Sequence, residues 1–189
     1  MRRFTTQVFL LLLVLLLALV HHLHAATYIC ASSFGTYDLI SSCITTETIE
    51  ISGTLTVIGS TSTNSPLHSI SGANQHQIFR VQADDTLTLS HLELKQGKGN
   101  QGGAISVQFN GRLRSTFVLF KLCIADSGGA LFVAGSASAW IMGCRFEGNT
   151  CKTAGNDVYI SSNNAEITLV NNEYSSHSSA SSSASTKKR

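Results

Sequence analysis

The sequence predicts an all-β fold in which the chain winds into about four to five stacked coils of about 26 residues each. Three observations predict it: apolar segments recur at a nearly constant spacing, each segment alternates apolar and polar side chains, and glycine and small polar residues separate the segments. The 189 residues include one proline, and 13% are charged, which argues against collagen, coiled coils and charged disordered tails. This length and composition fit a single domain.

The recurring apolar segment is the strongest signal. It begins at Ile78, Ala104, Ala130 and Asp157, at spacings of 26, 26 and 27 residues. Each of these short segments has a period of two, so one face of each predicted strand is apolar. Two further strands follow in each unit, and three strands predict a three-sided coil. The second strands are 87–89, 113–115, 139–141 and 167–169, and the third are 92–94, 118–120, 144–146 and 172–174.

Stacked coils place equivalent residues over one another in parallel strands about 4.8 Å apart. One coil alone buries too few apolar side chains to offset the entropy of ordering its backbone, so several coils must fold together. Five inward columns follow from the spacing, and only Ser115 interrupts them with a clearly polar side chain. The columns are Phe79/Ile105/Leu131/Val158, Val81/Val107/Val133/Ile160, Leu87/Leu113/Ala139/Ile167, Leu89/Ser115/Ile141/Leu169 and Leu94/Phe120/Phe146/Tyr174.

Glycine pairs mark the corner before the first strand of two coils. These pairs are Gly102-Gly103 and Gly128-Gly129. A tight corner inside a stack requires a positive φ and leaves no room for a Cβ. A phosphate-binding loop is the alternative interpretation, but the sequence lacks the GxxxxGK[ST] motif.

The first 25 residues predict a secretory signal peptide. Arg2 and Arg3 precede thirteen apolar residues from Val8 to Val20, and small residues follow at Ala25 and Ala26. A thirteen-residue helix spans only about 20 Å, against about 30 Å of bilayer hydrocarbon, so we expect cleavage after Ala25 or Ala26 in preference to a membrane anchor, and no later transmembrane segment.

The exported chain divides into three parts. Residues 26–77 carry a weaker version of the pattern and predict an N-terminal cap with an irregular first coil, and residues 78–174 form the coils. Residues 175–189 are a tail rich in serine and alanine, which we expect to be disordered.

All five cysteines lie in the exported part, where disulfides are stable, and an odd number leaves at least one thiol without an intramolecular partner. Cys30 and Cys43 are close in sequence near the new N-terminus and predict one disulfide. Cys123 and Cys151 fall in successive corners and are candidates for a second. Cys144 occupies an inward position, where we expect a buried, unreactive thiol.

The charges and motifs exclude several classes of function. Between the two terminal basic clusters, eight basic residues face eleven acidic residues, a net charge of −3, which argues against a nucleic-acid partner. No CxxC or HxxxH motif occurs, so we expect no metal and no cofactor.

The sequence offers only weak candidates for catalytic residues. Asp84 and Asp85 form the one adjacent acidic pair, at a turn where aspartate commonly bonds its own backbone. Glu93 and Arg145 face outward two coils apart, about 9.6 Å, with Leu119 between them. We therefore expect a non-catalytic protein.

Two outward columns suggest a binding surface. The column Arg80/Ser106/Phe132/Tyr159 places two aromatic rings side by side, and the column Thr88/Arg114/Trp140/Thr168 places Arg114 where it can stack on Trp140. The candidate surface, Arg114, Phe132, Trp140 and Tyr159, suits sugar rings or a partner protein. The alternative is that loops cover these side chains or that they simply suit a sheet surface.

The corner motifs resemble those of a known repeat. Gly102-Gly103-Ala104-Ile105 and Gly128-Gly129-Ala130-Leu131 are similar to the GGAI/GGAL motif, and Phe146-Glu147-Gly148-Asn149 is similar to the FxxN motif, of the chlamydial polymorphic outer membrane protein repeats. The span from about 49 to 174 resembles the pectin-lyase-like group. This resemblance implies a short, single-stranded, right-handed parallel β-helix, and it implies adhesion or surface display in some members and polysaccharide cleavage in others.

The expected function combines these observations. We expect a secreted or surface-displayed module without catalysis, which binds an extracellular polysaccharide or a surface protein. A polysaccharide lyase or hydrolase of the pectin-lyase-like group is the alternative. The uncovered strands of the last coil also favour end-to-end self-association.

Overall fold

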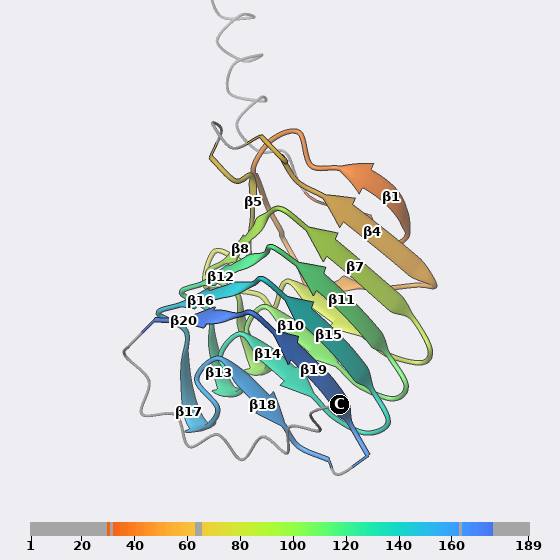
Figure 1. The fold of residues 1–189 in the computed structure, drawn as a ribbon, viewed down its shortest axis with the longest axis vertical. Coiled ribbons are helices and arrows are strands. Elements are labelled where there is room, and N and C mark those ends of the chain that lie inside the picture. The colour runs from red at the N-terminus through yellow and green to blue at the C-terminus, as the bar shows by residue number, and fades with distance from the viewer. Residues whose placement is uncertain (1–29, 31, 63–65, 163, 176–189) are drawn as a thin grey trace, which may run out of the picture.

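The computed structural model describes residues 30, 32–62, 66–162 and 164–175. In these residues the chain forms strands β1 to β20 and no α-helix. It winds through about five turns of a parallel β-helix, and each strand pairs with its counterpart in the next turn (Figure 1). The predicted all-β, parallel β-helical fold is therefore confirmed.

The strands form four parallel sheets, here called A to D. Sheet B contains β1 (Gly35–Asp38), β4 (Thr54–Ile58), β7 (Thr86–Ser90), β11 (Arg112–Thr116), β15 (Ser138–Met142) and β19 (Glu166–Val170). Sheet A contains β2 (Cys43–Ile44), β5 (Ser69–Ser71), β8 (Glu93–Lys95), β12 (Leu119–Lys121), β16 (Arg145–Glu147) and β20 (Glu173–Tyr174). Sheet C contains β3 (Ile49–Glu50), β6 (Phe79–Val81), β10 (Ile105–Val107), β14 (Leu131–Val133) and β18 (Val158–Ile160). Sheet D contains β9 (Lys98–Gln101), β13 (Ile124–Ser127) and β17 (Thr150–Ala154).

The predicted columns are confirmed by the strand register. Ile105 lies between Phe79 and Leu131 in sheet C, and the other four columns follow the same spacing. Within one column the rings of Phe120 and Phe146 stack 4.8 Å apart at an interplanar angle of 5°. Such side chains, nearly all buried, form one continuous core along the helix axis.

Ser115 is fully buried in this core, between Leu89 and Ile141. Its hydroxyl oxygen lies 3.4 Å from the Cys144 sulfur, and the two groups share a hydrogen bond. The polar interruption of the column is therefore satisfied by a thiol from the following coil.

Sheet D is an addition to the predicted three-sided coil. No strand was predicted in these segments, and Lys98-Gly99-Asn100-Gln101 shows no apolar alternation. These strands nevertheless pair in parallel with β13 between β9 and β17. Backbone pairing to adjacent coils, not side-chain burial, gives this fourth side its extended structure.

The glycine corners have the predicted geometry. Gly102 and Gly128 adopt φ values of +71° and +63°. A Cβ at Gly103 would collide with the carbonyl of Gly129 and lie 2.7 Å from the amide nitrogen of Ile124. The corner therefore needs one glycine for its dihedral angle and the next for space.

Asn149 gives the FxxN-like segment a structural role. It is buried, and its side chain accepts a 3.0 Å hydrogen bond from the Cys123 amide and donates one of 3.1 Å to the Phe120 carbonyl. It also donates to the Asp157 carboxylate at 2.9 Å. One asparagine thus satisfies two buried backbone groups of the preceding coil.

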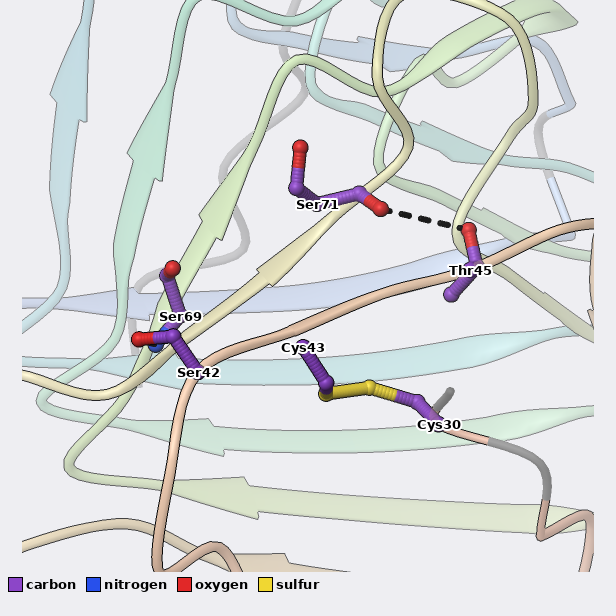
Figure 2. The surroundings of a disulfide bond; sticks show 6 residues. All are labelled: Cys30, Ser42, Cys43, Thr45, Ser69 and Ser71. Atoms are coloured by element: carbon purple, nitrogen blue, oxygen red, sulfur yellow. Dashed lines mark hydrogen bonds between the residues drawn. A yellow bond between two sulfur atoms is a disulfide. The ribbon is translucent and has the colours of Figure 1, made fainter. Parts of the chain in front are cut away.

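The predicted Cys30–Cys43 disulfide is confirmed, with the two Cα atoms 5.8 Å apart. Figure 2 shows this bond beside the polar contact between Thr45 and Ser71, where the Thr45 hydroxyl donates to the Ser71 carbonyl. The disulfide ties residue 30 to β2, at the N-terminal end of sheet A. An apolar cavity of about 310 Å³ lies here, lined mainly by core residues of the first turns.

The predicted signal peptide, residues 1–25, and all but the first residue of the predicted tail lie outside the described residues. Within the described part of the chain, no helix has the length and hydrophobicity needed to cross a membrane.

Candidate binding surfaces

Arg114 and Trp140 lie side by side in sheet B, on the neighbouring strands β11 and β15. The guanidinium carbon of Arg114 lies 4.4 Å from the centre of the Trp140 ring. Arg114 is exposed and Trp140 is half-buried. The predicted cation–π stack therefore exists, and it presents a flat cationic face to solvent.

Phe132 does not belong to an exposed surface, and this part of the prediction is wrong. Its side chain is only 3% exposed, although the neighbouring Leu131 and Val133 occupy the inward positions. The corner before β10 lies close to the backbone of β14, since a Cβ at Gly102 would lie 3.0 Å from the Phe132 nitrogen. Tyr159, in the next coil, is half-buried and packs on Phe132 with ring centres 5.9 Å apart.

The four predicted residues therefore form two separate pairs. Arg114 and Trp140 belong to sheet B, whereas Phe132 and Tyr159 belong to sheet C. The Arg114–Trp140 pair is a stack that faces solvent, whereas the Phe132–Tyr159 pair is largely buried.

A polar groove that was not predicted from the sequence lies beside the second pair. It has a volume of about 510 Å³ and is formed by β9 of sheet D together with β6 and β10 of sheet C. Ser106 lies in this groove, and Phe132 replaces it at the equivalent position of the next coil. The bulky ring is buried where the smaller serine side chain leaves space. The groove is lined by Thr48, Gln75, His76, Gln77, Arg80, Gln82, Lys98, Gly99, Asn100, Gln101, Ser106 and Gln108.

Amide side chains dominate the groove, and hydrogen bonds orient several of them. The Gln108 amide donates to the Gln101 side-chain oxygen at 3.0 Å and to the Ser106 hydroxyl at 2.7 Å. Gln77 is 5% exposed and donates to the backbone carbonyls of Gln101 and Gly102. An amide offers both donors and acceptors, so this wall matches groups that carry both, such as hydroxyls.

The groove carries positive charge. Arg80 and Lys98 line it, and Arg80 forms a 2.7 Å ion pair with Glu50 at its edge. None of the described residues that line the groove is aspartate or glutamate. The groove can therefore bind hydroxyl and carboxylate groups, but its lining offers no pair of carboxyl groups for acid–base cleavage.

The sequence did contain a signal for this groove. Gln75 and Gln101 are 26 residues apart, and so are Gln82 and Gln108. Reading the repeat for polar as well as apolar columns predicts two stacked pairs of amides on neighbouring coils. The closing of sheet D against sheet C is what the sequence pattern does not reveal.

The predicted Cys123–Cys151 disulfide is not formed, because the two residues are out of register. Cys123 is fully buried, and its amide bonds to Asn149 of the next coil, whereas Cys151 pairs with Ala125. Both residues are free thiols, as is the buried Cys144. Burial raises the pKa of Cys123 to about 12 and raises the pKa of Cys144, which fits unreactive thiols in the core.

The acidic residues considered for catalysis have structural roles. Asp84 adopts a positive φ of 69° at its turn, and the Asp85 carboxylate accepts a 2.6 Å hydrogen bond from the Gly53 amide of the preceding coil. Glu93 and Arg145 flank Leu119 in the ladder, as predicted. The described residues contain no group of three His, Cys, Asp or Glu placed to hold a metal ion.

The fold and surfaces define the class of the protein as a parallel β-solenoid with a polar groove. No family model, curated protein or solved structure matches the chain.

Proposed function

We propose that this protein is a secreted or surface-displayed, non-catalytic β-helical module that binds extracellular glycans through the groove between sheets C and D. The observation that carries the proposal is the composition of the groove: six amide side chains, two hydroxyl side chains and two cations, without a carboxylate among its described lining residues. Sugars present dense hydroxyl groups, which such a wall can both donate to and accept from.

The charge of the groove indicates which class of sugar it favours. Arg80 and Lys98 favour carboxylate-bearing sugars over neutral ones, since an arginine or lysine bond to a carboxylate is stronger than a bond to a hydroxyl. We therefore propose an oligosaccharide that contains uronic acid. A surface protein with an acidic loop is the second partner class that the same cations favour.

Export is part of the proposal. Residues 1–25 have the sequence of a secretory signal, and the Cys30–Cys43 disulfide is of the kind that persists in oxidising compartments. The resemblance to pectin-lyase-like proteins and to polymorphic outer membrane protein repeats supports surface display. It also supports the alternative function, a polysaccharide lyase or hydrolase.

The binding proposal is tested with an oligosaccharide array and calorimetry on the mature, disulfide-bonded protein. We expect binding to uronate-containing chains, with affinity lowered about tenfold or more by Arg80→Ala or Gln108→Ala because each removes direct polar contacts. Lys152→Ala, an exposed cation outside the groove, is the matched control. Retained affinity in both groove variants contradicts the proposal.

The Trp140→Ala variant distinguishes the groove from the Arg114–Trp140 stack. Loss of glycan binding in this variant alone assigns the ligand to sheet B instead of the groove.

Incubation with pectate-type polymers and calcium tests the enzymatic alternative. Unsaturated products or new reducing ends formed at enzyme-like rates would overturn the non-catalytic part of the proposal.

A further inference from the structure

One coil carries an exposed apolar row that its neighbours lack. We call this row the ridge and define it as Phe117, Leu119, Leu122 and Ile124, on and beside β12 and the start of β13. Phe117, Leu122 and Ile124 are 51%, 48% and 39% exposed, and Leu119 is half-buried. The neighbouring coils present polar side chains or glycine at the same positions: His91, Glu93, Gln96 and Lys98 in one, and Gly143, Arg145, Gly148 and Thr150 in the other.

The ridge does not cover the core. The inward side chains of this coil, Val118 and Phe120, are already buried, so the outward apolar groups do not fill the core. Phe117 instead packs on His91 of the preceding coil, with ring centres 5.1 Å apart, and remains half exposed. Leu122 and Phe117 also adopt positive φ values of 53°, a conformation that bulky residues rarely take. An exposed apolar row of this kind, interrupted only by Lys121, is typical of an interaction surface.

Charged side chains lie on both sides of the ridge in a complementary order. Glu93 and Arg145 flank Leu119, and Lys95 and Glu147 flank Lys121 in the same two rows. A two-fold axis along the ridge exchanges these rows between two copies. Glu93 of one copy then faces Arg145 of the other, Lys95 faces Glu147, and both contacts occur twice.

We propose that this protein forms a two-fold symmetric homodimer through the ridge, with the symmetry axis parallel to β12. Phe117, Leu119 and Leu122 of one copy pack on the same residues of the other, and the flanking charges pair across the axis. Within one copy, Glu93 lies 3.3 Å from Lys95, and Glu147 lies 2.7 Å from Arg145 and 3.4 Å from Lys121. The contacts across the axis therefore extend existing ion pairs, and Glu147 also compensates Lys121, which meets its own copy. The surface goes beyond the proposed glycan function, because none of the ridge residues lines the groove.

Sedimentation equilibrium of the mature protein from about 1 to about 200 µM measures the association. We expect a monomer–dimer equilibrium that weakens as salt rises, because the flanking charges contribute to it. The double variant Leu122→Gln/Ile124→Lys copies Gln96 and Lys98 of the adjacent coil, so the fold accepts these residues at equivalent positions. We expect it to weaken dimerisation about tenfold or more. Phe109→Ser, a change at a 64% exposed residue outside the ridge, is the control that leaves dimerisation unchanged.

A complementation experiment tests the two-fold geometry itself. Glu93→Lys sets a lysine opposite Arg145 in its homodimer, and Arg145→Glu sets a second glutamate opposite Glu93, so each variant alone is expected to be monomeric. A mixture of the two variants restores both opposite-charge pairs in a heterodimer, and we expect it to dimerise with near-native affinity.

Three outcomes overturn the proposal. The first is that the native protein remains monomeric over the whole concentration range. The second is that the ridge double variant dimerises as well as the native protein. The third is that the mixture of charge variants associates no better than each variant alone.

Discussion

Two asparagine side chains of this protein form hydrogen bonds with backbone groups of the preceding coil. Asn149 bonds the amide of Cys123 and the carbonyl of Phe120, both in the preceding coil. Asn172 acts on Cys144 in the same manner, since the Cys144 amide donates to the Asn172 side chain at 2.8 Å. The stability of these coils therefore depends on polar side chains that lie about one repeat later in the sequence.

Asn149→Ala should lower the free energy of unfolding by about 2–4 kcal/mol, because it leaves a buried N–H and a buried C=O without partners. Urea unfolding followed by tryptophan fluorescence measures the loss. Asn164→Ala, at an exposed turn, is the control and should change stability little. Equal effects in both variants would contradict the role of Asn149.

Asp157 gives stability a dependence on pH. Burial raises the pKa of its carboxyl group above the ordinary value of 3.8, and the hydrogen bond from Asn149 lowers it in part. The folded state therefore holds the proton more tightly than the unfolded state. Its contribution to stability falls as pH rises from about 3.8 through the raised pKa and is constant above that value.

Asp157→Asn keeps an acceptor for Asn149 and removes the desolvated charge. We expect the variant to be more stable than the native protein at pH 7 and the difference to shrink as pH falls toward about 3.5. Urea midpoints at a series of pH values measure this. A difference that grows at acid pH would show that the charged form is the one the fold stabilises.

At the scale of elements, the strand register of sheets A, B and C was predictable from the sequence, and the fourth side of the coil was not. The columns of sheets A, B and C follow from a spacing of about 26 residues, because a parallel stack forces equivalent side chains together. Sheet D has no apolar alternation and was not predicted. The polar groove, which β9 of sheet D forms with β6 and β10 of sheet C, was missed with it, and so was the burial of Phe132.

Glycine at a corner avoids two different costs, the strain of a positive φ and the steric clash of a Cβ atom. Gly103→Ala should lower stability by about 3 kcal/mol or more, since its Cβ would meet backbone atoms of two adjacent segments that cannot move aside. Gly53→Ala is the matched variant, with φ at +81° and no atom within 4 Å of the added Cβ. It carries only the conformational cost, about 1 kcal/mol. Thermal unfolding of both variants measures these losses of stability. Equal losses would contradict the close packing of the corner at Gly103.

At the scale of the whole molecule, the two ends of the solenoid differ. The N-terminal end carries a disulfide between Cys30 and Cys43. At the other end the inward residues of the last coil are only partly covered, and Tyr174 is 46% exposed although it stacks on Phe146. End-to-end self-association at this edge stays a prediction, and it is distinct from the dimer proposed through the ridge.

The repeat predicted the parallel β-helix and three of its four sides, but it did not predict which outward side chains are exposed. The two cysteines near the N-terminus were paired correctly because few residues separate them. Cys123 and Cys151 were paired wrongly because a pairing between coils depends on register to the single residue, and Cys123 stacks with Asn149 instead. The same register stacks the outward side chains, so Arg114 and Trp140 were placed correctly beside each other, whereas the burial of Phe132 does not follow from register and was not predicted.

Oxidative cross-linking tests the central claim, the stacking of residues 26 positions apart, most directly. In a Cys151→Ser background, Thr88→Cys with Arg114→Cys places two thiols on adjacent paired strands, whose spacing of about 4.8 Å suits a disulfide. Thr88→Cys with Trp140→Cys places them two coils apart, about 9.6 Å, which is too far. We predict an intramolecular disulfide in the first variant and none in the second, by mass mapping of a non-reduced digest. The opposite result, or equal cross-linking in both, would contradict the stacked solenoid.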